Sequence, residues 1–130
     1  MKTALVCIGL LALLVFVLGL AVSLTRGKTK KSFGYPDDPT APLTKLCRAH
    51  ANAAEYVPLL GLLMVVLAMR SEPAAWVLWT MILATVSRYV HAVGVVAMPT
   101  LNRPNPLRFL GALGTYVTGI ALVVALLISV

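Results

Sequence analysis

Residues 4–24 read ALVCIGLLALLVFVLGLAVSL, a stretch near the amino terminus that carries no charge. A helix rises about 1.5 Å per residue and the hydrocarbon core of a bilayer is roughly 30 Å thick, so this stretch is long enough to cross it. A cleaved secretory signal is the alternative, but its apolar region spans only about 7–15 residues. Basic residues also follow the stretch directly. We therefore predict a transmembrane helix over residues 4–24.

The rest of the chain repeats this pattern. Apolar stretches predict three further helices, over residues 46–69, 73–98 and 107–130. Pro73 is expected at the first position of its helix, where proline is favoured. Residues 25–45 contain Lys, Gly, Pro and Asp, and the prolines, Pro42 among them, predict a loop. The sequence thus predicts one all-α integral membrane domain over residues 1–130, a bundle of four transmembrane helices.

The composition supports this class of protein. Of 130 residues, 60% are hydrophobic and 12% are charged, against about 45–50% apolar and 25% charged in soluble domains. The net charge of +7 can indicate nucleic-acid binding, but the cations here lie between apolar stretches, so we expect no nucleic-acid partner. Cys7 and Cys47 are expected to be packing residues without a disulfide.

The distribution of cations predicts the orientation in the membrane. The first and third loops and their flanks hold most of them: Arg26, Lys28, Lys30, Lys31, Lys45, Arg48, Arg103 and Arg108. Only Lys2 and Arg70 stand on the other side. Because cytoplasmic loops are enriched in Lys and Arg, both loops are expected in the cytoplasm, in a bacterial inner membrane or an endomembrane. A small multidrug transporter is a further reading, but it would need a carboxylate in the first helix, which this chain lacks.

Several polar residues lie inside the predicted spans, where each ionisable group costs about 2.5–3.5 kcal/mol. At helical spacing Arg48, Asn52 and Glu55 share one face of the second span. A cation, an amide and an anion in this order complement a small zwitterionic ligand. The alternative is an internal network that joins helices. His50 points to the opposite side and is expected to lie between helices or at the interface, not to bind a ligand.

The third and fourth spans carry further candidates. Arg88 and His91 share a face of the third span. One interpretation of Arg88 is a buried ion pair with Glu55. Arg108 opens the fourth span, either as a positively charged flank or as a ligand group. No spacing of Cys, His, Asp and Glu indicates a zinc site, so we expect no metal. Small residues that allow close helix approach or room for a ligand follow Arg108: Gly111, Ala112, Thr115 and Gly119.

Four segments resemble one family. Residues 48–58, RAHANAAEYVP, resemble the second-helix motif R-A-x-x-N-x-x-E-x-x-P of the MAPEG family, membrane-associated proteins in eicosanoid and glutathione metabolism. Within it, residues 30–38 (KKSFGYPDD), 88–91 (RYVH) and 106–108 (PLR) are similar to the branch of microsomal glutathione transferase and microsomal prostaglandin E synthase. The resemblance covers essentially the whole chain. Ala51, Val95 and Phe109 depart from the pattern of that branch.

The resemblance implies a homotrimer that binds glutathione between subunits near the cytoplasmic face. By matching positions, the glutathione-binding residues would be Arg48, Asn52, Glu55, Arg88 and His91. Arg108 would be the catalytic residue facing the sulfur, and Asp38 would support it.

The expected activity is that of a glutathione-dependent membrane transferase or peroxidase. Glutathione would be a co-substrate, and a lipophilic electrophile or hydroperoxide would arrive through the membrane lipids. A thiol with a pKa of about 8.5 is roughly 3% ionised near neutral pH, so the enzyme must stabilise the thiolate, and an arginine such as Arg108 can do this. The alternative is a non-catalytic lipid-binding or scaffold protein on the same fold.

Overall fold

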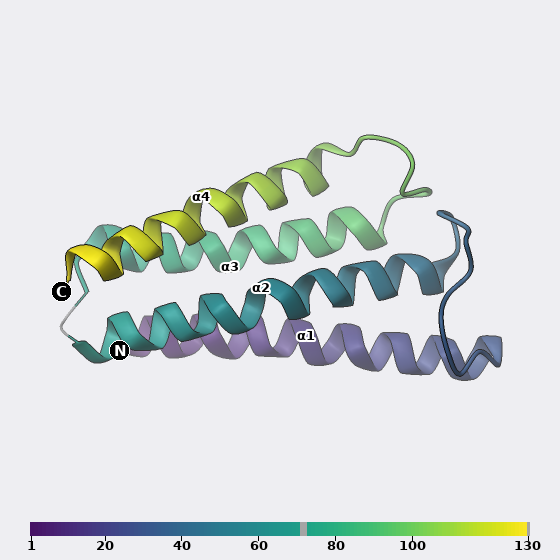
Figure 1. The fold of residues 1–130 in the computed structure, drawn as a ribbon, viewed down its shortest axis with the longest axis horizontal. Coiled ribbons are helices and arrows are strands. Elements are labelled where there is room, and N and C mark those ends of the chain that lie inside the picture. The colour runs from purple at the N-terminus through teal and green to yellow at the C-terminus, as the bar shows by residue number, and fades with distance from the viewer. Residues whose placement is uncertain (71–72, 130) are drawn as a thin grey trace.

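Four helices make up the fold (Figure 1). The computed structural model describes residues 1–70 and 73–129. The helices are α1 (Lys2–Thr29), α2 (Pro42–Arg70), α3 (Ala75–Val96) and α4 (Pro106–Ile128). No strand occurs in the described ranges, and all four helices are long and apolar enough to cross a membrane. The predicted all-α bundle of four membrane-spanning helices is confirmed.

The first two helices are longer than predicted. α1 does not end near residue 24 but continues through Arg26 and Lys28, and Lys30 ends it in the left-handed conformation with a φ of 53°. Cations in the last turn interact favourably with the helix dipole, which favours this extension. α2 begins at Pro42, so the prediction that this proline belongs to the loop is wrong. Proline is well suited to the first turn, where its missing N–H has no helical partner.

The predicted start of the third helix is also wrong. Pro73 precedes the N-cap Ala74, whose carbonyl oxygen accepts the first helical hydrogen bonds from Val77 and Leu78. α3 ends at Val96, two residues before the predicted end. α4 begins at Pro106. The predicted terminal residue, Val130, lies outside the described residues, as do Ser71 and Glu72, which follow α2 in the sequence.

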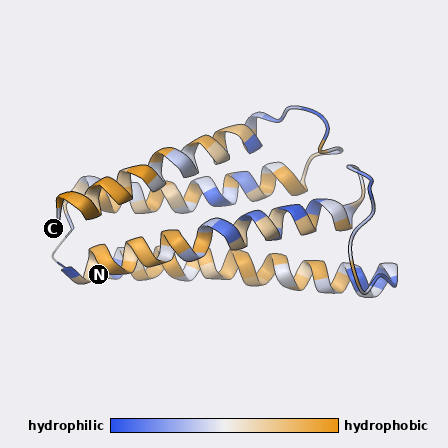
Figure 2. Ribbon diagram, viewed as in Figure 1, coloured by the Kyte–Doolittle hydropathy of each residue, from blue (hydrophilic) through white to orange (hydrophobic). Residues whose placement is uncertain are grey.

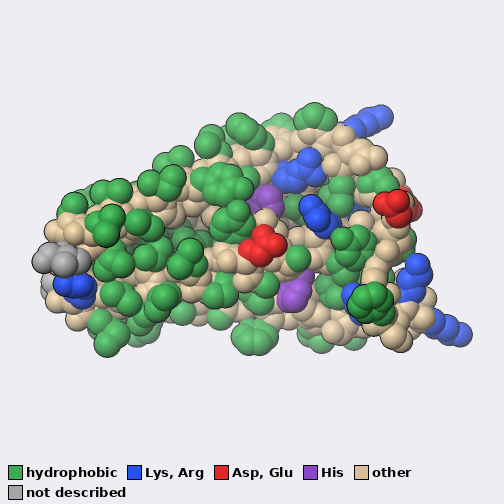
Figure 3. All heavy atoms as spheres, viewed as in Figure 1, with side chains coloured by type: hydrophobic (Ala, Val, Ile, Leu, Met, Phe, Trp, Pro, Cys, Tyr) green, Lys and Arg blue, Asp and Glu red, His purple; other side chains and the backbone are tan. Residues whose placement is uncertain are grey.

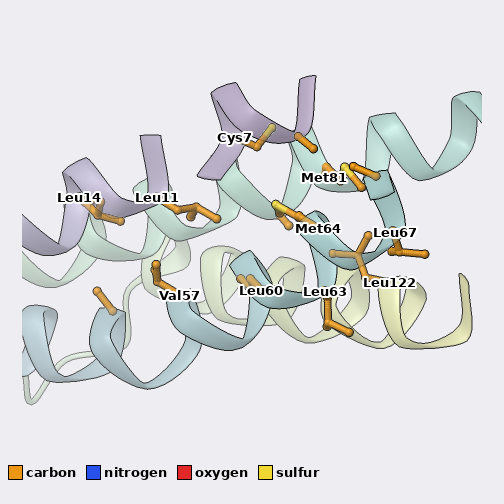
Figure 4. Close-up of a cluster of buried hydrophobic side chains, with 14 of the residues drawn as sticks. Cys7, Leu11, Leu14, Val57, Leu60, Leu63, Met64, Leu67, Met81 and Leu122 are labelled. Carbon is orange, nitrogen blue, oxygen red and sulfur yellow. The ribbon is translucent and has the colours of Figure 1, made fainter. Parts of the chain in front are cut away.

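The helices pack in an open arrangement. The most extensive contacts join α3 to α4 and α1 to α2, and α2 also contacts α3 and α4. Residues 2–29 of α1 and 106–128 of α4 do not contact each other. The core includes Leu11, Val57, Met64, Met81 and Leu122, and Figure 4 shows these side chains meeting between the helices. Hydrophobic residues predominate along all four helices (Figure 2), and many large ones are exposed, as expected for helices that face lipid.

The first and third loops lie together at one end of the bundle, and both termini lie at the other (Figure 1). The backbone N–H of Leu101 donates to the carbonyl oxygen of Pro39 at 3.0 Å. Lys45 Nζ donates to the carbonyl oxygen of Met98, also at 3.0 Å. These bonds fix the end of α3 against the start of α2, next to the polar part of both helices.

Candidate functional site

The polar face of α2 forms one wall of a pocket of about 420 Å³. Arg48, Asn52 and Glu55 lie on this wall, and His91 of α3 and Arg108 of α4 lie across from them. Figure 3 shows basic, acidic and histidine side chains gathered on this face. Five of the six predicted catalytic and glutathione-binding residues therefore line one pocket, which we call the polar pocket. Its remaining lining residues are Ala51, Val95 and Leu101.

The sixth residue, Arg88, lies behind this pocket and does not line it. Its side chain is 1% exposed and donates from Nη2 to Asn52 Oδ1 at 2.8 Å. Nη1 donates to Thr115 Oγ1 at 3.4 Å, and the guanidinium lies 5.2 Å from the centre of the Tyr56 ring. The suggested ion pair with Glu55 does not form between these two described residues, because Glu55 is exposed and the amide of Asn52 is the acceptor.

The contact with Arg88 sets the orientation of the Asn52 amide. An arginine side chain has donors and no acceptor, so Asn52 must turn its oxygen toward Arg88. The NH₂ group of Asn52 then remains available to a ligand. Asn52 accordingly offers hydrogen-bond donors to the polar pocket, as a carboxylate or peptide carbonyl of a ligand requires.

His91 is positioned by close packing of α3 on α4. A side-chain carbon at Gly111 would collide with the backbone of His91, and one at Gly94 would collide with the backbone of Arg108. Helix backbones can approach this closely only where a residue has no side chain. His91 Nδ1 lies 3.1 Å from the carbonyl oxygen of Arg108 as a result. The prediction that small residues on α4 allow close approach is confirmed at Gly111.

A second pocket, of about 740 Å³, shares His91 and Arg108 with the polar pocket. Its other walls are largely apolar and are lined by Asn102, Pro104, Asn105, Pro106, Phe109 and Ala112. We call it the apolar pocket. Arg108 and His91 therefore stand where a polar and an apolar compartment meet. The guanidinium of Arg108 also donates from Nη1 to the carbonyl oxygen of Leu101 at 3.0 Å.

Asp38 is not brought to Arg108 within the chain. It is exposed, and its Oδ1 accepts from the backbone N–H of Thr40 at 2.8 Å and from Thr40 Oγ1 at 2.7 Å. These hydrogen bonds, first that of the side chain and then that of the backbone, lower the pKa of the Asp38 carboxyl below its usual value. His50 packs against Gly19 of α1, so its predicted position between helices is confirmed.

A sequence model of one protein family covers nearly all of this architecture. The model of the MAPEG family matches residues 4–128. The chain belongs to the MAPEG family. None of the curated proteins compared with this chain matches it. MAPEG proteins are four-helix membrane bundles broadly associated with glutathione, and they include glutathione transferases and non-catalytic members. This MAPEG chain is accordingly an integral membrane protein with a glutathione-related or lipid-binding role.

One structural residue of this MAPEG site was missed in the sequence. Asn105 is 6% exposed and caps α4, accepting from the backbone N–H of Leu107 at 2.9 Å. Its Nδ2 donates to the carbonyl oxygen of Gly94 at 2.6 Å, which ties the start of α4 to α3. An asparagine directly before a proline is a signal for a helix start that was available in the sequence.

Two tyrosines of the MAPEG chain also meet near Arg88 without having been predicted as a pair. Tyr56 of α2 donates its hydroxyl to that of Tyr116 of α4 at 3.3 Å, and the ring centres are 5.8 Å apart. Tyr89 of α3 does not join this pair and donates its hydroxyl to the carbonyl oxygen of Leu10 at 2.8 Å. No sequence signal marks the tyrosine pair, because it depends on how α2 and α4 pack.

Proposed function

We propose that this MAPEG chain binds glutathione as a co-substrate in the polar pocket and activates its thiol. The observation that carries the proposal is the assembly of Arg48, Asn52 and Glu55 opposite His91 and Arg108. Glutathione has two carboxylates, one ammonium group and one thiol. Cationic and amide donors suit its carboxylates, and Glu55 suits its ammonium group.

Arg108 is the proposed thiol-activating residue. Lowering the pKa of a thiol by roughly two units takes about 2.7 kcal/mol, which a well-placed and partly desolvated arginine can supply. Arg108 is half-buried and borders both pockets. A thiol held in the polar pocket near Arg108 would therefore face the apolar pocket, where a second substrate can bind.

The second substrate is proposed to be a lipophilic electrophile or hydroperoxide that enters from the bilayer. The walls that Phe109 and Ala112 contribute to the apolar pocket favour such a molecule. Attack of the thiolate on carbon gives a thioether, the product of a transferase. Attack on a peroxide oxygen releases an alcohol and begins a peroxidase reaction; an isomerase reaction is also compatible with the site. The resemblance to the prostaglandin synthase branch stays a prediction.

A homotrimer with both loops in the cytoplasm is part of this proposal. The open side of the polar pocket, and the absence of contact between residues 2–29 of α1 and 106–128 of α4, favour a neighbouring chain as the cover. Asp38 bonds to Thr40 within its own chain, so the proposal gives it no part in thiol activation. Chemical crosslinking in mild detergent is expected to give trimers. Monomers and dimers alone would contradict the assembly.

The deciding experiment is an ultraviolet titration of the detergent-solubilised chain with glutathione, because a thiolate absorbs where a thiol does not. A saturable rise is expected for the wild type and its loss for Arg108→Ala. Arg103→Ala is the matched control, since it removes the same charge from an exposed residue that lines neither pocket. No rise and no heat of glutathione binding in the wild type would refute the proposal.

A non-catalytic lipid-binding or scaffold role is the second candidate. A groove of about 350 Å³ between α2 and α4 favours it, with apolar walls that include Leu59, Leu63, Ile120 and Val123. An acyl chain fits such walls. Affinity for lipid without affinity for glutathione would select this role over the enzyme.

A further inference from the structure

The contact between His91 and Arg108 fixes which ring nitrogen of His91 carries hydrogen. Nδ1 lies 3.1 Å from the carbonyl oxygen of Arg108. A carbonyl oxygen can only accept, so Nδ1 must be the donor in the neutral imidazole. Nε2 is then the unprotonated nitrogen, with a free lone pair.

His91 as a whole is only 8% exposed, yet its Nε2 is not fully buried. Among residues 1–70 and 73–129, the fully buried side-chain nitrogen or oxygen atoms without a partner are Arg26 Nη1 and Arg88 Nε. His91 Nε2 has no hydrogen bond and is not one of these atoms. Since His91 borders both the polar and the apolar pocket, the residue lies where a thiol and an electrophile would meet.

Charged groups from three helices lie near His91. Arg88 lies on the same helix, Arg108 comes from α4, and Arg48 and Glu55 come from α2. None of the described residues of α1 lines either pocket. The ring gains a positive charge when it takes a proton, and a thiolate formed beside the ring compensates that charge.

We propose that His91 Nε2 accepts the proton of the glutathione thiol, which makes His91 a catalytic residue beside Arg108. The inference rests on the proposed function. An arginine stabilises a thiolate but has no lone pair to take its proton. The S–H bond breaks, the proton moves to Nε2 and the electron pair stays on sulfur. The sulfur attacks the electrophile, and the imidazolium returns the proton to the leaving group or, where the leaving group is chloride, to water.

Two substitutions separate catalysis from positioning. In His91→Asn the amide nitrogen takes roughly the place of Nδ1, so the bond to the Arg108 carbonyl survives and Nε2 is lost. In His91→Gln the amide nitrogen lies near the place of Nε2, and the bond to Arg108 is lost. If His91 had only a structural role, His91→Asn should retain activity and His91→Gln should lose it.

With chlorodinitrobenzene as electrophile, we expect His91→Asn to lower kcat by about tenfold or more, within the range known for general bases. The KM for glutathione should change much less than kcat, because the substitution leaves the ligand contacts of Arg48, Asn52 and Glu55 on α2 intact. Wild-type kcat in His91→Asn would overturn the proposal.

Proton counting on the wild type tests the proposal without any variant. Titration calorimetry with glutathione in two buffers of different ionisation enthalpy, at about neutral pH, gives the protons released, and ultraviolet absorbance gives the thiolate formed. If His91 keeps the proton, thiolate forms with far less than one proton released per site. A full proton per thiolate would overturn the role of His91 and leave thiol activation intact. Absence of both heat and thiolate would refute the proposed function, and the role of His91 with it.

Discussion

Arg88 Nη2 lies 2.8 Å from Asn52 Oδ1, and this contact joins α3 to α2 behind the polar pocket. A buried cation thus meets a neutral amide although a carboxylate, Glu55, lies one turn further along the same helix face. The arrangement leaves the Glu55 carboxylate exposed and free for a ligand. It also explains how a residue outside the pocket can affect what the pocket binds.

Arg88→Met should destabilise the chain and weaken glutathione binding together. Losing the buried partner leaves Asn52 Oδ1 unsatisfied, at a cost of about 1–3 kcal/mol, and frees the amide to rotate. Thermal unfolding in detergent and calorimetry with glutathione measure the two effects. Arg70→Met, at the exposed end of α2, is the control for loss of charge. Unchanged affinity in Arg88→Met would show that Arg88 does not orient Asn52.

Asn52→Asp should keep the fold and lose the ligand. The new carboxylate still accepts from Arg88, so the unfolding temperature should not fall. It presents no donor to the pocket and repels the carboxylates of glutathione, so the Kd should rise at least about tenfold, or roughly 1.4 kcal/mol. Asn52→Leu can neither accept from Arg88 nor donate to a ligand, so it should lower both the unfolding temperature and the affinity for glutathione. Wild-type affinity in Asn52→Asp would contradict the orientation of the amide.

Gly111→Ala should push α4 away from α3 and displace Arg108. The added carbon would collide with the backbone of His91, and such overpacking costs about 1–3 kcal/mol. Gly119→Ala is a matched control, because its added carbon would lie 3.8 Å from Leu60 Cδ2, an ordinary contact. We expect the control to keep its unfolding temperature and its thiolate signal. Equal behaviour of the two variants would argue against close packing at Gly111.

Asn105→Ala should lower both stability and turnover. It removes the cap of α4 and leaves the carbonyl oxygen of Gly94 without its donor, with an expected loss of about 1–3 kcal/mol. Because Arg108 lies in the first turn of α4, kcat should fall together with the stability. Arg103→Ala, at an exposed position of the same loop that lines neither pocket, should change neither value. Unfolding curves and initial rates give the comparison.

Asp38→Asn tests whether the loop acid supports Arg108. Within the chain its carboxyl bonds to Thr40 and not to Arg108. The thiolate signal with glutathione should therefore stay at the wild-type level. Its loss, with glutathione still bound, would show that a neighbouring chain brings Asp38 to the site.

The span count and the polar face of α2 were predictable because both depend on local sequence. Apolar length sets whether a helix crosses the bilayer, and helical spacing places Arg48, Asn52 and Glu55 together whatever surrounds them. The partner of Arg88 was not predictable, since helix rotation decides whether Asn52 or Glu55 lies closer. The position of Asp38 depends on the path of an irregular loop. The extension of α1 was not predictable, because cations such as Arg26 and Lys28 occur in loops as well as in the last turn of a helix.

The contact pattern of the helices has a consequence for biogenesis. α1 packs most extensively on α2, and α3 packs most extensively on α4, so each hairpin is held by helices that are neighbours in sequence. Such hairpins can form as the chain emerges and inserts, because their contacts close only short loops. The polar pocket lies across the seam between them, with α2 on one side and α3 and α4 on the other. The site is completed only when the two hairpins dock, so changes at the seam impair activity before they prevent insertion.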